Sequence, residues 1–165
     1  MKVVFSHGQE SGPWGSKISK LADIARQKGF EVDSIDYTAI PDPDQRVTHL
    51  LNTIGDEQEI ILVGSSMGGY VSLVASEQLD CKAIFLLAPA LYIAGYQNHQ
   101  YQTRCPHISI IHGWSDDVIV PEHSIKFAKQ AQCSLHLIKG DHRLKSSINH
   151  VVGIFEQFLQ TVIEQ

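Results

Sequence analysis

The sequence has 165 residues, of which 43% are hydrophobic and 19% are charged. These values exclude a disordered or fibrous chain, and the length predicts one domain over residues 1–165 with a core that needs no disulfide or metal. Thirteen basic residues against 18 acidic residues give a net charge of −5 with histidine neutral. The sequence therefore predicts neither a nucleic-acid partner nor binding to an anionic membrane.

The cysteines and the N-terminus predict a cellular location. Cys81, Cys105 and Cys133 are odd in number and show no C-x-x-C or zinc-finger spacing, which favours reduced thiols and a cytoplasmic protein. The first residues lack the apolar stretch of a signal peptide, and the longest uncharged run, Ala83–Gln100, is interrupted by Pro89. We therefore expect neither secretion nor a membrane span.

Short β-branched runs alternate with amphipathic stretches along the chain. Periodicity predicts strands at Val3–Phe5, Val32–Ile35, Ile60–Val63, Ala83–Leu87, Ile108–Ile111 and Leu135–Ile138. It predicts helices over Ser16–Lys28, Asp44–Ile54, Pro121–Ala131 and Ser147–Ile163. This alternation predicts an α/β fold, a three-layer sandwich with a parallel sheet and helices on both of its faces. In such a sheet the chemistry gathers in loops that follow the carboxyl ends of strands.

One of these loops carries the motif G-x-S-x-G. It is the segment Gly64-Ser65-Ser66-Met67-Gly68, which lies between a predicted strand and a helical pattern. In this context the motif predicts a nucleophile elbow, in which glycines allow a close backbone approach and Ser66 is lifted above the sheet. The backbone N–H of Met67, at the helix start, would supply half of an oxyanion hole.

Two nucleotide-binding interpretations compete with the elbow. A phosphate-binding loop requires Gly-Lys-Ser/Thr, but Gly69 is followed by Tyr70. The spacing G-x-G-x-x-G of dinucleotide-binding proteins is also absent. The sequence therefore favours the elbow over a flavodoxin-like nucleotide binder.

A serine nucleophile needs a histidine as base and a carboxylate to orient it, and in this architecture the acid and then the histidine follow the serine in the chain. Of nine histidines, only His142 lies in a short loop after the last predicted strand. His112 is predicted to shape a turn. A metal site at His136, Asp141 and His142 is a possible alternative, but no His-x-x-x-His or H-E-x-x-H pairing supports it.

The acid is one of two adjacent aspartates. Counting forward from Gly113 favours Asp116, and counting back from Pro121, the predicted start of a helix, favours Asp117. The residue without this role is expected to be a turn or cap residue. The Gly-rich loop after the first strand offers the second oxyanion N–H, which we assign to Gln9.

Together these motifs make the chain resemble the α/β-hydrolases, and among them the small, nearly lidless serine hydrolases of the retinoblastoma-binding-protein and predicted-esterase type. The resembling segments are Ser6–Gly8, Gly64–Gly69, Leu87–Ala90, Gly113–Pro121 and Gly140–His142. The resemblance implies about six parallel strands, no antiparallel N-terminal hairpin and no large lid.

The resemblance also implies a function. In that group the second aspartate of the pair is commonly the acid, which favours Asp117 and gives a catalytic triad of Ser66, Asp117 and His142. The expected activity is hydrolysis of a small-molecule ester or thioester without a cofactor or metal. The alternative is a catalytically weak binding module on the same fold. The long connection 89–104 is interpreted either as a small cap over the acyl pocket or as an aromatic cluster that pins the loop.

Overall fold

Six parallel strands form one open sheet in a computed structural model that describes residues 1–165. The elements in chain order are β1 (Lys2–Ser6), α1 (Ser16–Gln27), β2 (Glu31–Ile35), α2 (Pro43–Ile54), β3 (Ile60–Ser65), α3 (Met67–Ala75), η1 (Ser76–Gln78), β4 (Cys81–Leu87), β5 (His107–Gly113), α4 (Pro121–Ala131), β6 (Ser134–Ile138), η2 (Lys145–Ser147) and α5 (Ile148–Ile163). The strands lie in the order β2-β1-β3-β4-β5-β6. All six predicted strands are confirmed.

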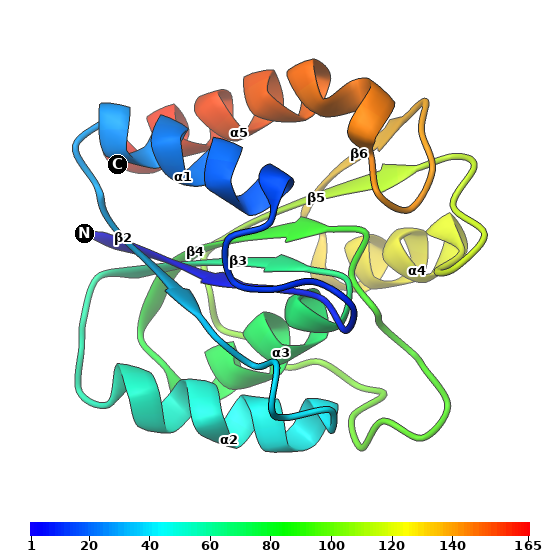
Figure 1. Cartoon of the computed structure of the whole chain (residues 1–165), viewed down its shortest axis with the longest axis horizontal. Coiled ribbons are helices and arrows are strands. Elements are labelled where there is room, and N and C mark those ends of the chain that lie inside the picture. The colour runs from blue at the N-terminus through cyan, green and yellow to red at the C-terminus, as the bar shows by residue number, and fades with distance from the viewer.

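Helices cover both faces of the sheet. Helices α1 and α5 lie together on one face, and α2, α3 and α4 lie on the other (Figure 1). Right-handed crossovers between parallel strands produce this arrangement, because each helix packs back onto the sheet that it leaves. The predicted three-layer α/β fold without an antiparallel hairpin or a large lid is confirmed. None of the helices combines the length and the apolar character needed to cross a membrane.

The core consists of two apolar clusters, one on each face of the sheet. Strand β3 shows how one strand supplies both, since its side chains alternate between the faces. Ile60 and Leu62 pack in the cluster beneath α2, α3 and α4, whereas Ile61 and Val63 pack in the cluster beneath α1 and α5. Every residue of α3 is buried. The helix that follows Ser66 is therefore held in the centre of the molecule.

Local capping sets the start of α2. The side chain of Asp42 accepts hydrogen bonds from the backbone N–H groups of Asp44 and Gln45, at 2.8 and 3.0 Å. Pro43 occupies the first helical position, where its missing N–H costs nothing. Helix α2 therefore begins one residue before the predicted start.

The strand register brings the carboxyl ends of the strands to one edge. Ser6 is paired with Gly64, Ser65 with Leu87, and Gly113 with Ile138. The loops that follow β1, β3, β5 and β6 therefore meet, although they are far apart in the sequence. These are the loops in which the sequence predicts the functional residues.

Candidate active site

Ser66 lies on the sharp turn between β3 and α3. Its backbone has φ 55° and ψ −118°, a conformation that non-glycine residues rarely adopt and that persists only where surrounding contacts enforce it. Its N–H donates to the carbonyl of Leu87, and its carbonyl accepts from Ala90. The predicted elbow geometry is thus present, with Ser66 held at the carboxyl edge of the sheet.

The two glycines of the motif are required by close backbone contacts. A Cβ atom at Gly64 would lie 2.2 Å from the carbonyl oxygen of Gly68, and a Cβ atom at Gly68 would lie 2.0 Å from that of Ser6. Both distances are far below van der Waals contact, so no other residue fits without backbone movement.

His142 lies between Ser66 and a carboxylate. Its Nε2 is 3.0 Å from Ser66 Oγ, and its Nδ1 is 2.8 Å from Asp116 Oδ2. A carboxylate only accepts, so Nδ1 carries the proton and Nε2 accepts from the serine hydroxyl. The structure therefore brings together the predicted serine and histidine in the arrangement of a catalytic triad.

The third member of this arrangement is Asp116, and the prediction of Asp117 is wrong. Asp116 Oδ2 contacts His142, and its Oδ1 accepts from the N–H groups of Val118 and Ile119 at 2.9 and 2.8 Å. The Asp116 side chain is fully buried, whereas Asp117 is exposed.

The forward count from Gly113 was the correct one for a structural reason. The N–H of Asp116 donates to the Gly113 carbonyl at 3.3 Å and closes a turn directly after β5. The backbone then turns so that the N–H groups of Val118 and Ile119 donate to the Asp116 carboxylate, and this turn leaves Asp117 on the outer side of the loop. Helix α4 begins at Pro121 as predicted, but the turn in between invalidates a count from that end.

His112 is a residue of the site whose contacts the sequence did not indicate. Its Nε2 lies 2.7 Å from the Ile119 carbonyl and 3.1 Å from Asp116 Oδ2, and its Nδ1 lies 2.6 Å from Ser124 Oγ. Two acceptors at Nε2 assign the proton there, so Nδ1 accepts from the serine hydroxyl. Burial lowers the pKa of this imidazole and favours the neutral form. The predicted turn role is incomplete, because His112 also contacts the triad carboxylate.

We expect His112→Leu to lower both stability and kcat. The change leaves the Ile119 carbonyl and Ser124 hydroxyl without their partner in a buried place, at about 1–3 kcal/mol for each such group, and it removes one contact that holds Asp116. Chemical unfolding and ester hydrolysis measure the two effects. His107→Leu, at the other end of β5, is the control and should leave kcat unchanged. Full activity of His112→Leu would show that Asp116 needs no such support.

The loop after β1 lies against the elbow, as predicted. A Cβ atom at Gly8 would be 3.5 Å from Ser66 Cβ. The next residue, Gln9, is exposed, and its backbone N–H donates to no group of the protein. Met67 opens α3, so its N–H has no intrahelical acceptor. Assignment of these two N–H groups to an oxyanion hole remains a prediction.

A partly buried lysine lies near the site. Burial lowers the pKa of Lys17, in the first turn of α1, to about 8, and the carboxylates of Asp116 and Asp141 act in the opposite direction. Lys17 makes no ion pair with either carboxylate.

The segment 89–104 has no helix or strand and contains a cluster of aromatic contacts. The ring of Tyr70, in α3, lies 4.7 Å from Tyr96 and 6.3 Å from Tyr101 between centroids. Asn98 N–H donates to the Tyr70 hydroxyl, which itself donates to Asp44 at 2.6 Å. These contacts confirm the aromatic-cluster interpretation. The interpretation as a cap remains a prediction.

A hollow of about 680 Å³ lies away from the triad, between the first halves of β5 and β6 and helix α5. None of Ser66, Asp116 and His142 lines it. No three His, Cys, Asp or Glu side chains are grouped so that they could hold a metal ion. The candidate active site is therefore assigned from the triad geometry and not from the shape of the surface.

Solved structures with the same fold extend over the whole chain. A protein from Xanthomonas campestris pv. campestris, named for the α/β superfamily of hydrolases, is 27% identical with a TM-score of 0.90 over 97% of this chain and 98% of its own. Est1E from Butyrivibrio proteoclasticus is 17% identical with a TM-score of 0.82, over 99% and 88%. A serine hydrolase without a lid from Xanthomonas campestris is 18% identical with a TM-score of 0.69, over 96% and 81%.

These neighbours place the chain among structures of the α/β-hydrolase superfamily and confirm the resemblance seen in the sequence. No curated protein sequence matches the chain. A family model, that of an uncharacterised protein family, matches residues 2–164. Because this match spans nearly the entire sequence, the chain belongs to the uncharacterised protein family UPF0227.

Proposed function

We propose that this protein is a serine hydrolase that cleaves small carboxylic esters or thioesters through an acyl-enzyme on Ser66. The observation that carries the proposal is the position of His142, whose two ring nitrogens contact Ser66 Oγ and Asp116 Oδ2 at the same time. A serine hydroxyl is a weak nucleophile, and this arrangement supplies both the base and the group that orients it.

The reaction has two steps. In the first, Ser66 Oγ attacks the carbonyl carbon while His142 Nε2 takes the hydroxyl proton, and the imidazolium then gives this proton to the departing alcohol or thiol. In the second, water loses a proton to His142 and attacks the acyl-enzyme, which releases the carboxylic acid and restores Ser66. Asp116 stays ionised throughout and stabilises the imidazolium through Nδ1–H.

Each step forms a tetrahedral intermediate whose oxygen is negatively charged. We assign its stabilisation to the backbone N–H groups of Met67 and Gln9, which come from the loops after β3 and β1. Donors at fixed positions can contribute substantially because they need no reorientation when the charge develops.

A rival function is a binding module that has the fold without the activity, since fold alone does not establish function. The strained backbone of Ser66 favours the enzyme, because strain at a functional residue has to be maintained by its surroundings. We expect small-molecule substrates and a cytoplasmic location.

Labelling with a fluorophosphonate tests the proposal directly. The reagent should modify the wild-type protein at Ser66, should fail to modify Ser66→Ala, and should modify the matched control Ser65→Ala at a normal rate. A panel of p-nitrophenyl esters of rising acyl length should show a preference for short chains, and EDTA should leave the rates unchanged. Absence of Ser66 labelling together with absence of ester hydrolysis would favour the binding module.

A further inference from the structure

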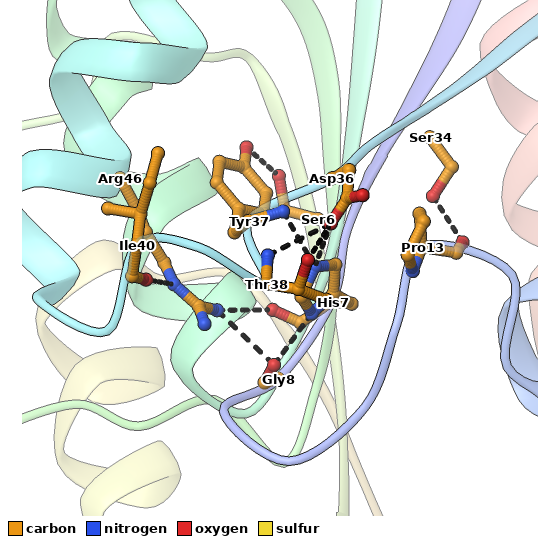
Figure 2. A network of polar contacts seen from close by, with 10 residues as sticks. All are labelled: Ser6, His7, Gly8, Pro13, Ser34, Asp36, Tyr37, Thr38, Ile40 and Arg46. Carbon is orange, nitrogen blue, oxygen red and sulfur yellow. Dashed lines mark hydrogen bonds and ion pairs between the residues drawn. The ribbon is translucent and has the colours of Figure 1, made fainter.

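Arg46, on α2, is a buried cation without a carboxylate partner. Its residue exposure is 1%, and no Asp or Glu oxygen lies within ion-pair distance of its guanidinium. All of its hydrogen bonds are made to backbone carbonyls: Nε donates to Ile40, and Nη1 donates to His7 and Gly8. Figure 2 shows the side chain extending from α2 to the loop after β1. The guanidinium therefore donates hydrogen bonds to two backbone carbonyls of the loop that lies against Ser66.

Placing a guanidinium there is costly. Removal of a charge from water is unfavourable unless hydrogen bonds compensate for it, and burial lowers the pKa of Arg46. The side chain nevertheless stays protonated, as arginine does in proteins. Without a carboxylate to neutralise it, its positive charge acts on the carbonyls that it contacts.

The carbonyl of Gly8 receives two donors. Arg46 Nη1 lies 3.2 Å from this oxygen, and His7 Nδ1 lies 2.7 Å from it. His7 Nε2 accepts from the N–H of Tyr37 at 2.9 Å, so the His7 proton lies on Nδ1 and points to the carbonyl. Figure 2 shows both donors converging on this loop. The direction of the Gly8 carbonyl is therefore set from two sides.

The orientation of this carbonyl also sets the orientation of the Gln9 N–H. The carbonyl of Gly8 and the N–H of Gln9 belong to one planar peptide group, and the chain has no cis peptide bonds. In a trans peptide these two groups point in opposite directions. The N–H of Gln9 therefore points away from the buried guanidinium, and it has no partner within the protein.

We propose that Arg46 is a positioning residue for the oxyanion hole: it orients and polarises the Gly8–Gln9 peptide so that the Gln9 N–H can stabilise the negative oxygen of the tetrahedral intermediate. A cation at the carbonyl end withdraws electron density from the amide and makes the N–H a stronger donor. This inference rests on the proposed hydrolase function, because only a reaction with an oxyanion uses the donor.

The first test separates positioning from a merely structural role. Arg46→Met should lower kcat about 100-fold, within the range for loss of one oxyanion donor, while KM changes little because the ground-state substrate carries no charge there. Binding of a trifluoromethyl ketone, which forms a hemiketal oxyanion on Ser66, should weaken in parallel with kcat. Arg46→Lys, which keeps the charge but loses the planar fork, should fall between Arg46→Met and the wild type.

Arg26→Met is the control for loss of an arginine, because Arg26 lies on the exposed side of α1, where it pairs with Asp23 and lies over the ring of Trp14. It makes no contact with the Gly8–Gln9 peptide and should keep wild-type kcat. Thermal melts identify any variant that is not folded at the assay temperature. If Arg46→Met unfolds, Arg46→Lys carries the same test, and a lowered kcat with unchanged KM is again the expected result.

A double-mutant cycle with Gln9→Pro identifies the atom through which Arg46 acts. Proline removes the N–H at position 9, and Gly8 tolerates the restriction that proline places on its neighbour. Adding Arg46→Met to Gln9→Pro should cause little further loss of kcat, because the two changes remove one interaction. Multiplicative losses, or full activity of Gln9→Pro, would overturn the proposal.

The outcomes distinguish this inference from the proposed function. If the wild-type protein shows no Ser66-dependent hydrolysis, the proposed function fails and the inference fails with it. If the wild type is active but the Arg46 variants keep its kcat and its affinity for the trifluoromethyl ketone, only the inference is overturned.

Discussion

Asp116→Asn is expected to lower kcat for ester hydrolysis by about 10⁴, the size of the effect of this substitution in Ser-His-Asp enzymes. The amide of asparagine presents an N–H to His142 Nδ1, so the imidazole is held in the tautomer that cannot accept the Ser66 proton. Asp117→Asn should change kcat by no more than about twofold, as expected for an exposed position. Steady-state kinetics on both variants measure the difference.

We expect Asp116→Asn to stay folded, so that a lower kcat of this variant reports on catalysis and not on unfolding. The side-chain oxygen of asparagine can still accept from the N–H groups of Val118 and Ile119, which Asp116 Oδ1 does in the native protein, and His112 Nε2–H loses one acceptor but keeps the Ile119 carbonyl. Thermal melts of Asp116→Asn and Asp117→Asn provide the check. An inactive Asp117→Asn beside an active Asp116→Asn would mean that the loop after β5 is arranged differently in solution.

Gly68→Ala is expected to destabilise the protein by several kcal/mol and to abolish hydrolysis. The new methyl group would lie 2.0 Å from the carbonyl oxygen of Ser6 and 2.7 Å from that of His7. Insertion of a single methylene into a well-packed core costs typically 1–3 kcal/mol. The contact here is with the backbone at the end of β1, a strand that is paired on both sides with β2 and β3, and this backbone cannot move aside as a side chain can. Urea unfolding should show the loss as a lowered midpoint.

Gly153→Ala is the matched control and should change stability in the opposite direction. A Cβ atom at Gly153, within α5, meets nothing within 4 Å. Alanine in a helix interior is more stable than glycine by about 0.5–1 kcal/mol. If Gly68→Ala were as stable as Gly153→Ala, the elbow would be packed less closely than the structure shows.

Much of the fold is determined by local patterns in the sequence. A short, continuous apolar run such as Ile60–Val63 is typical of a strand that is buried on both faces, and the spacing of Ile18, Leu21 and Ala25 places three apolar residues on one face of a helix. The elbow can also be recognised in the sequence, because the tight turn around Ser66 leaves no room for a Cβ atom at positions 64 and 68 and therefore requires glycine there. Ser66 and His142 could therefore be selected before their distance was known.

The identity of the acid was decided only by the tertiary structure. Asp116 and Asp117 are adjacent and chemically identical, so composition and spacing do not separate them. What separates them is the direction of the chain after β5, which depends on the Asx turn that Asp116 forms with the next residues and on His142, 26 positions away.

The contacts of His112 and Arg46 were also decided only by the tertiary structure. His112 reads as a turn residue and Arg46 as one polar position in an amphipathic helix, because no local pattern marks a side chain whose partners lie elsewhere. Arg46 reaches the Gly8 carbonyl across 38 positions of sequence. Periodicity reports whether a residue faces the core, whereas the contacts of a buried polar group are set by which loops the sheet brings to one edge. The sequence by itself therefore determined the scaffold and the serine of the elbow, and the register of the parallel strands decided which side chains lie around that serine.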